Sequence, residues 1–232
     1  MKETNRITFN GFSPGTLKFL KDVAAKNSKS WFEEHRQEFE DYLMTPMRAL
    51  VMELSGPMMT IDPELETRPV VNKTISRIYR DTRFSKDKSL FRSNMWITFK
   101  RPIRDWKEAP AFYFDISPDA YHYGMGFYSA SPDTMKNLRG TIDTRPDSFR
   151  KMVAFYKKRG PYTIGGEQYR RVFNESVPTD LKPWYQQRNL YIYCGRKINQ
   201  RLFSRKLVSE LTSAFYTLAP LYHFFLQIKA EN

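Results

Sequence analysis

Apolar residues recur at three- and four-residue steps near the start of the chain. Leu17 and Leu20 follow this spacing directly after the dipeptide Ser13-Pro14. Serine caps the first turn of a helix and proline fits the first helical position, where its missing N–H is not needed. The pattern therefore predicts a helix over 14–26.

A second helical pattern follows Ser30. Glu33 stands three residues further on, which is the spacing of a capping box. The apolar stripe continues for about 25 residues beyond this start. Because proline cannot donate a backbone hydrogen bond, we expect Pro46 to kink or interrupt the helix and Gly56-Pro57 to end it.

The middle of the chain alternates and is rich in aromatic and β-branched residues, which is typical of strands. This pattern occupies 94–100, 111–116 and 120–128. The tripeptide Ser117-Pro118-Asp119 joins the last two stretches and has the composition of a tight turn. The sequence therefore predicts an antiparallel hairpin here.

Helical patterns return after the hairpin. We expect helices from Ser131 to about 140, from Thr144 to about 158 and from Ser204 to about 227, with a short strand over 189–194. Helices, then strands, then helices is the order of an α+β protein. We expect a central antiparallel sheet with N-terminal and C-terminal helices packed against it, in a single domain over 1–232.

The composition is that of a folded chain, because 41% of the residues are hydrophobic and 16% are aromatic. The predicted core contains Trp31, Phe32, Leu50, Leu54, Trp96, Ile97, Phe112, Phe114, Phe127, Ile192, Leu211 and Phe215. A single cysteine, Cys194, excludes an internal disulfide framework and a cysteine-rich zinc site. No apolar run approaches the roughly 18 residues of a membrane span. We therefore expect a cytoplasmic protein without a membrane partner.

Positive charge is concentrated in one part of the chain. The formal net charge is +13, and residues 68–107 hold 12 basic and 3 acidic side chains. The densest part runs from Arg77 to Lys88 and is followed by Arg92. Arginine presents a planar fork that suits phosphate and carboxylate groups. The candidate binding residues are Arg77, Tyr79, Arg80, Asp81, Arg83, Lys86, Lys88 and Arg92.

The run from Arg77 to Lys88 reads Arg-x-Tyr-Arg-Asp-Thr-Arg-Phe-Ser-Lys-Asp-Lys. On this run the chain resembles the bacterial and fungal family called domain of unknown function 2461. The resemblance extends to the opening helix at Phe12-Ser13-Pro14 and to Gly126-Phe127-Tyr128. It supports the fold and marks the motif, but it implies no reaction. The family usually has asparagine where His35 stands, which argues against His35 as a catalytic base.

Known catalytic and cofactor motifs are missing from the sequence. There is no phosphate-binding loop and no dinucleotide fingerprint. The histidines His35, His122 and His223 lack metal-ligand spacing, so we expect neither a metal nor a cofactor. We interpret His122 as a strand-face residue and Cys194 as a buried hydrophobic residue. The sequence does not decide whether the protein is an enzyme, and it does not reveal an oligomeric state.

Three functions fit the basic motif. In the first, residues 77–92 line a cleft and bind an anionic small molecule that carries phosphate or carboxylate. In the second, a nucleic-acid-binding face is formed by the basic segment and a helix with Arg150, Lys151, Lys157, Lys158 and Arg159. In the third, the motif is a structural ion-pair network, with partners such as Asp87 or Asp115. A cleft at the motif would favour the small-molecule hypothesis, and a continuous basic surface would favour nucleic-acid binding. Pairing of every arginine with a carboxylate would favour the structural network.

Overall fold

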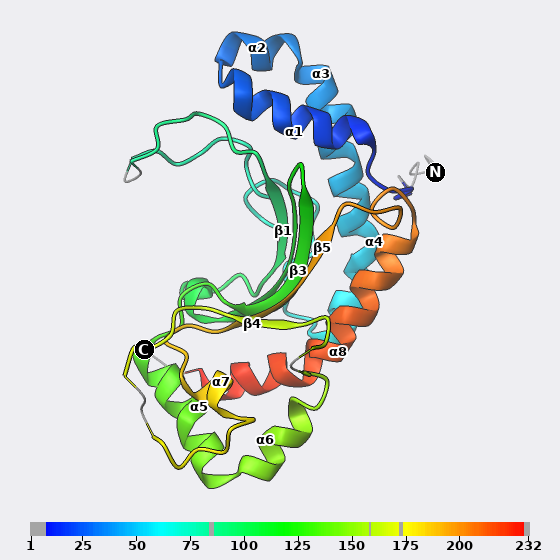
Figure 1. The fold of residues 1–232 in the computed structure, drawn as a ribbon. Coiled ribbons are helices and arrows are strands. Elements are labelled where there is room, and N and C mark those ends of the chain that lie inside the picture. The colour runs from blue at the N-terminus through cyan, green and yellow to red at the C-terminus, as the bar shows by residue number, and fades with distance from the viewer. Residues whose placement is uncertain (1–7, 84–85, 158, 172–173, 230–232) are drawn as a thin grey trace. The chain divides into compact units, whose positions relative to one another are not determined.

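The computed structural model in Figure 1 describes residues 8–83, 86–157, 159–171 and 174–229. The sheet is antiparallel and has the strand order β1-β2-β3-β5-β4. Its strands are β1 (Met95–Phe99), β2 (Pro110–Ile116), β3 (Ala120–Phe127), β4 (Thr163–Gly165) and β5 (Tyr191–Lys197). Helices pack on this sheet, so the prediction of an α+β fold is confirmed.

The helices gather before and after the central strands. They are α1 (Pro14–Lys26), α2 (Lys29–Glu34), α3 (Arg36–Phe39), α4 (Thr45–Ile61), α5 (Pro132–Thr144), α6 (Pro146–Met152), α7 (Lys182–Tyr185) and α8 (Lys206–Ile228). A π-helical turn, η1 (Glu40–Met44), joins α3 to α4, and a short 3₁₀ turn, η2 (Trp106–Glu108), precedes β2.

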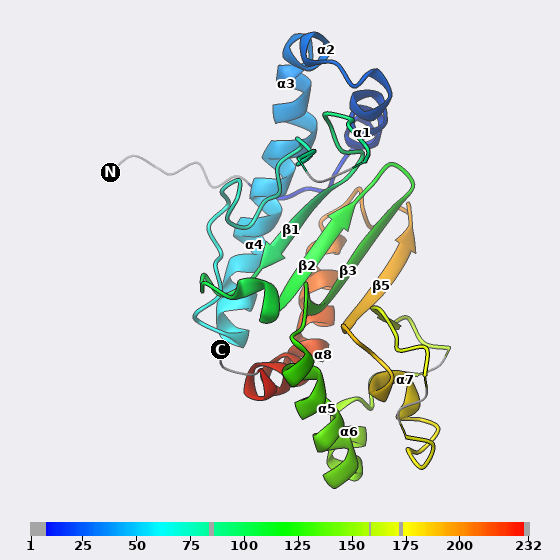
Figure 2. The ribbon, with the colours of Figure 1, turned by 90° about the vertical axis from the view of Figure 1, so that its left-hand side faces the viewer.

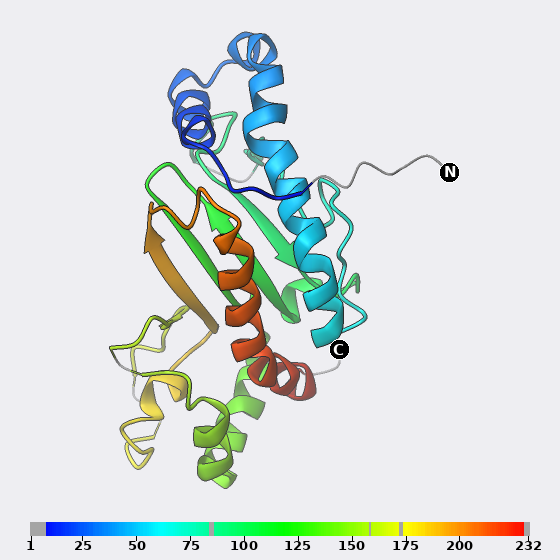
Figure 3. The ribbon, with the colours of Figure 1, turned by 90° about the vertical axis from the view of Figure 1, so that its right-hand side faces the viewer.

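The chain divides into two compact units. The first contains 1–99, 114–122 and 196–213, and the second contains 100–113, 123–195 and 214–232. In the first unit, the chain folds back after α2, so that η1 lies beside α1 (Figure 3). In the second, Phe112 and Phe127 of the sheet pack on α8. The expectation of a single domain over 1–232 stays a prediction.

Helix α1 has the predicted bounds. The hydroxyl of Ser13 accepts a hydrogen bond from the backbone N–H of Thr16 at 3.3 Å, and the Thr16 hydroxyl accepts one from the Ser13 N–H at 3.1 Å. These bonds satisfy two N–H groups at the helix end. Asn27 ends the helix in the left-handed conformation, with φ of 46°.

The second helix differs from the prediction at its start. It begins two residues earlier, because Ser28 rather than Ser30 accepts the hydrogen bond from the Trp31 N–H. Ser30 instead shares a hydrogen bond of 2.8 Å with the Ser28 hydroxyl. The helix is broken at His35, whose backbone leaves the helical region at φ −108° and ψ 18°.

The two prolines of α4 act differently. The α-helix is interrupted just before Pro46, as predicted, because the π-helical turn η1 ends at Met44 and α4 begins at Thr45. Pro46 lies in the first turn of α4, and the Tyr42 carbonyl four residues earlier accepts from the Thr16 hydroxyl at 2.5 Å instead. Contrary to the prediction, the helix continues through Pro57 to Ile61. One missing backbone bond is outweighed there, because Met58 and Ile61 continue the buried stripe.

Several boundaries in the second unit also differ. Helix α5 passes through Gly140 to Thr144, whose hydroxyl donates to the Gly140 carbonyl instead of capping the next helix. Helix α6 ends at Met152 rather than near 158. Strand β5 reaches Lys197, three residues further than expected. The sequence did not predict β4 or α7, because elements of three and four residues are too short to show a period.

The predicted core is mostly confirmed. Ten of the twelve residues are buried, and the exceptions are Trp31 and Trp96, which are half-buried. Strand β1 buries Met95, Ile97 and Phe99, so Trp96 must face the other side. Within the described ranges, no helix combines the length and apolarity that crossing a membrane requires.

Candidate anion-binding site

Residues 77–92, here called the basic arm, extend from the beginning of β1. Just before the arm, the Ser76 N–H donates to the Trp96 carbonyl at 2.9 Å, so this segment lies alongside β1. Within the first unit, the arm leaves on the side of β1 away from α4 (Figure 1). The structure describes 77–83 and 86–92 of the arm, so Phe84 and Ser85 lie outside the described residues.

The two described halves of the arm pair with each other as extended chain. The Arg80 N–H donates to the Leu90 carbonyl at 2.8 Å, and the Arg92 N–H donates to the Ile78 carbonyl at 2.9 Å. Tyr79 is exposed and Ile78 is buried, as alternation along a strand requires. The described residues of the arm are therefore extended rather than helical.

Uncharged contacts hold the arm against α1 and α2, beside which Figure 2 shows it. The Phe91 ring stacks on Phe32 with a centroid distance of 5.0 Å, and both Ile78 and Phe91 are buried. The Tyr79 ring lies 4.9 Å from that of Phe91. The Asn27 side-chain oxygen accepts the Leu90 N–H at 2.6 Å. Apolar packing and neutral hydrogen bonds therefore fix the position of the arm.

Both carboxylates of the arm pair with arginines. The Arg83 guanidinium donates to the two oxygens of Asp81 at 2.8 and 3.0 Å, and Arg80 lies 3.0 Å from Asp87. The hydrogen bond from Arg83 holds the pKa of Asp81 well below its usual range. Hydrogen bonds from Ser89, and then the charge of Arg80, lower the pKa of Asp87. Both carboxylates are therefore ionised at neutral pH.

These ion pairs lie at the surface. The side chains of Arg83 and Asp81 are 77% and 43% exposed, and that of Asp87 is 55% exposed. Solvent and salt screen such pairs, so they contribute little to stability. The pairs orient the arginines but are not what holds the arm in place.

Four further cations belong to the arm. Lys88 donates to the Thr82 carbonyl at 2.8 Å, and the Arg92 guanidinium lies 4.9 Å from the Trp96 ring centroid. For Arg77 and Lys86, the described residues place no carboxylate within ion-pair distance. With six cations and two carboxylates, the arm has a formal excess of four positive charges.

A polar row formed by Asn94, which directly precedes β1, and by one residue each of β2 and β3 was not predicted as a unit. The Asn94 amide donates to Asp115 at 2.7 Å, and the His122 Nδ1 lies 3.4 Å from the other Asp115 oxygen. His122 is half-exposed on its strand, in agreement with its interpretation as a strand-face residue. Asp115, considered above as a partner for the arginines, has Asn94 and His122 as its partners instead. Alternation within the predicted strands could have placed Asp115 and His122 on one face.

The sequence profile of a family described as conserved hypothetical proteins (DUF2461) matches residues 15–224. The chain belongs to the DUF2461 family. A search of the curated proteins found no match. The match covers the whole basic arm of this DUF2461 protein, and the description of the family names no activity.

In the helix of the nucleic-acid hypothesis, one arginine of this DUF2461 protein is compensated by two carboxylates. Arg150 contacts both Asp147 and Asp180 at 2.8 Å, and these hydrogen bonds raise its pKa. Lys158 lies outside the described residues. Cys194 is buried, as expected. In the part of the chain that the structure describes, no three His, Cys, Asp or Glu side chains gather as metal ligands.

Proposed function

We propose that this DUF2461 protein binds a phosphate- or carboxylate-bearing ligand through the basic arm. One observation carries the proposal: Ile78, Phe91 and backbone hydrogen bonds anchor the arm, while most of its cations face solvent. A structural ion-pair network would need the cations to hold the arm. Because they do not, a ligand anion is the better explanation for six cations in 16 residues.

Arg80 is a cation with an oriented partner in the arm. Its Nη2 lies 3.0 Å from an Asp87 oxygen, and a guanidinium has five N–H donors. Asp87 is itself fixed by the N–H and the hydroxyl of Ser89, at 2.9 and 2.6 Å. The arm therefore presents an arginine whose orientation is set before the ligand arrives, which reduces the entropy lost on binding. Arg77 and Lys86 add positive charge on the same segment.

A small anionic ligand is favoured over nucleic acid. The nucleic-acid hypothesis uses a second basic surface around Arg150, and two carboxylates compensate that arginine. A duplex or single strand is bound through many phosphates and needs a continuous basic surface. The cleft that we expect at the arm stays a prediction.

Thermal unfolding with added anions tests the proposal. Pyrophosphate and citrate serve as phosphate and carboxylate probes, and a ligand at 100 times its dissociation constant stabilises the fold by about 2.7 kcal/mol. We expect Arg80→Ala to remove this stabilisation. Arg48→Ala is the matched control, because Arg48 is similarly exposed and pairs with one carboxylate, Glu40.

The two variants also separate binding from structure. We expect Arg80→Ala to unfold like the wild type without ligand, since the arm is anchored by other residues. If neither probe shifts the melting temperature and Arg80→Ala is strongly destabilised, the arm is a structural network and the proposal is wrong.

A further inference from the structure

A second concentration of positive charge lies between the end of β5 and the first turns of α8. Residues 196–210 contain five cations and one carboxylate, Glu210, so their formal excess is four, as in the basic arm. The cations are Arg196, Lys197, Arg201, Arg205 and Lys206. All of these residues belong to the first compact unit.

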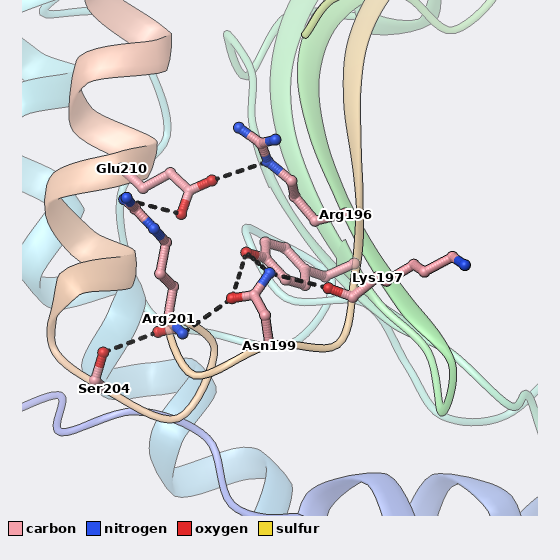
Figure 4. Close-up of polar contacts among 7 residues, drawn as sticks. Arg196, Lys197, Asn199, Arg201, Ser204 and Glu210 are labelled. Atoms are coloured by element: carbon pink, nitrogen blue, oxygen red, sulfur yellow. Dashed lines mark hydrogen bonds and ion pairs between the residues drawn. The ribbon is translucent and has the colours of Figure 1, made fainter.

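One nearly buried carboxylate lies between two of these arginines. The Glu210 side chain is only 8% exposed, and one of its oxygens lies 3.3 Å from Arg196 Nε. The other oxygen lies 3.8 Å from Arg201 Nη1. Figure 4 shows the two guanidinium groups on either side of the carboxylate, whereas Lys197 points away. Arg201 is 62% exposed and Arg196 is also exposed, so solvent reaches both groups.

The loop that carries Arg201 is held by a network of neutral hydrogen bonds. The Asn199 side-chain oxygen accepts the Arg201 N–H at 2.9 Å, and its amide donates to the Lys197 carbonyl at 3.0 Å and to the hydroxyl of Tyr121 at 3.2 Å. Tyr121 is fully buried. The Ser204 hydroxyl donates to the Arg201 carbonyl at 3.2 Å (Figure 4). The backbone that positions Arg201 is therefore fixed.

We propose that Arg196 and Arg201, oriented by Glu210, form a second binding site, for a phosphate group. Two guanidinium groups around one carboxylate leave a net positive charge, and a further anion offsets it. Arg205 does not share this arrangement, because its Nη2 donates to both oxygens of Glu53 at 2.9 and 3.0 Å. A phosphate has more acceptor oxygens than a carboxylate, so it can accept hydrogen bonds from two arginine forks at the same time.

The test measures pyrophosphate binding by calorimetry in the Arg80→Ala background, in which the basic arm is disabled. We expect Arg201→Gln to weaken binding about tenfold, the size of one lost charge-assisted hydrogen bond. Arg205→Gln is the matched control, since it removes the same charge from the same segment, and its affinity should stay close to that of the background. Arg201→Lys keeps the charge but loses the fork, and we expect it to bind more weakly than the background.

Arginine Nε–H signals in NMR spectra give a second measurement at the site. We expect the Arg196 signal to shift on titration with pyrophosphate, and circular dichroism to show that each variant is folded. Equal weakening by Arg201→Gln and Arg205→Gln would overturn the site, because net charge alone would explain it. Absence of binding in the background would overturn it as well.

The same titrations separate the sources of the phosphate. A short single-stranded oligonucleotide that binds more tightly than pyrophosphate, with dependence on Arg201, assigns the phosphate to a nucleic-acid backbone. If pyrophosphate binds more tightly than the oligonucleotide, the phosphate belongs to a small molecule. The proposed function is tested independently: if Arg80→Ala leaves wild-type binding unchanged and Arg201→Gln weakens it, the arm proposal is wrong and the second site stands.

Discussion

At the scale of single residues, Asn27 connects two segments that are far apart in the sequence. Its backbone ends α1 in the left-handed conformation, and its side-chain oxygen accepts the N–H of Leu90, 63 residues later. Asparagine suits both tasks, since it tolerates a positive φ and carries an acceptor. The position of the basic arm therefore depends on the cap of the first helix.

Replacement of Asn27 by glycine separates these tasks. Glycine adopts the positive φ without strain but leaves the Leu90 N–H without its acceptor. We expect Asn27→Gly to lower the free energy of unfolding by about 1 kcal/mol and to speed hydrogen exchange at the Leu90 amide. Asn27→Asp is the control, because it keeps an acceptor oxygen. Unchanged exchange at Leu90 in Asn27→Gly would show that the hydrogen bond does not hold the arm.

The sequence predicted the residue types of the candidate site better than their partners. The arginine, lysine and aspartate residues of the motif lie together on the arm, because they are neighbours in the sequence. Partners supplied from other segments, such as Asn27 for Leu90 and Asn94 for Asp115, depend on tertiary structure. Local choices were also close in energy: Ser28 and Ser30 are both good caps, and a cap contributes only about 1 kcal/mol.

At the scale of elements, length decided what the sequence could predict. Helix α1 and the hairpin of β2 and β3 were predicted because their periods repeat several times. Strand β4 has three residues, and it pairs with Tyr191 to Tyr193 of β5. A Cβ on Gly165 would lie 2.3 Å from the Tyr191 ring, so any other residue would require this ring to move. Nothing in a three-residue pattern reveals such a contact.

The two prolines of α4 differ in their expected cost. At Pro57 the helix loses the backbone bond to the Glu53 carbonyl, so we expect Pro57→Ala to stabilise the protein by about 1–2 kcal/mol in urea unfolding. At Pro46 the Thr16 hydroxyl already satisfies the carbonyl that proline leaves open. Pro46→Ala should therefore give no comparable gain. Equal gains from both variants would contradict this explanation.

At the scale of the whole molecule, the sequence gives the net charge but only part of its distribution over the structure. The net charge is +13, and the basic arm and residues 196–210 each hold an excess of four. The first concentration was apparent from the sequence. The second was less apparent, because the residues before and after it, 160–195 and 211–232, hold nearly equal numbers of basic and acidic side chains. The sequence also does not show that Glu210 contacts both Arg196 and Arg201, because this depends on the fold.

The division into two compact units raises the question of whether they unfold together. Strands β2, β3 and β5 and helix α8 each contribute residues to both units, so no boundary falls in a linker. Separating the units would break these elements in the middle, with loss of their backbone hydrogen bonds. We therefore expect one thermal transition, with coincident curves from far- and near-ultraviolet circular dichroism. Limited proteolysis should yield no pair of stable halves, and two resolved transitions or two stable fragments would contradict the single domain.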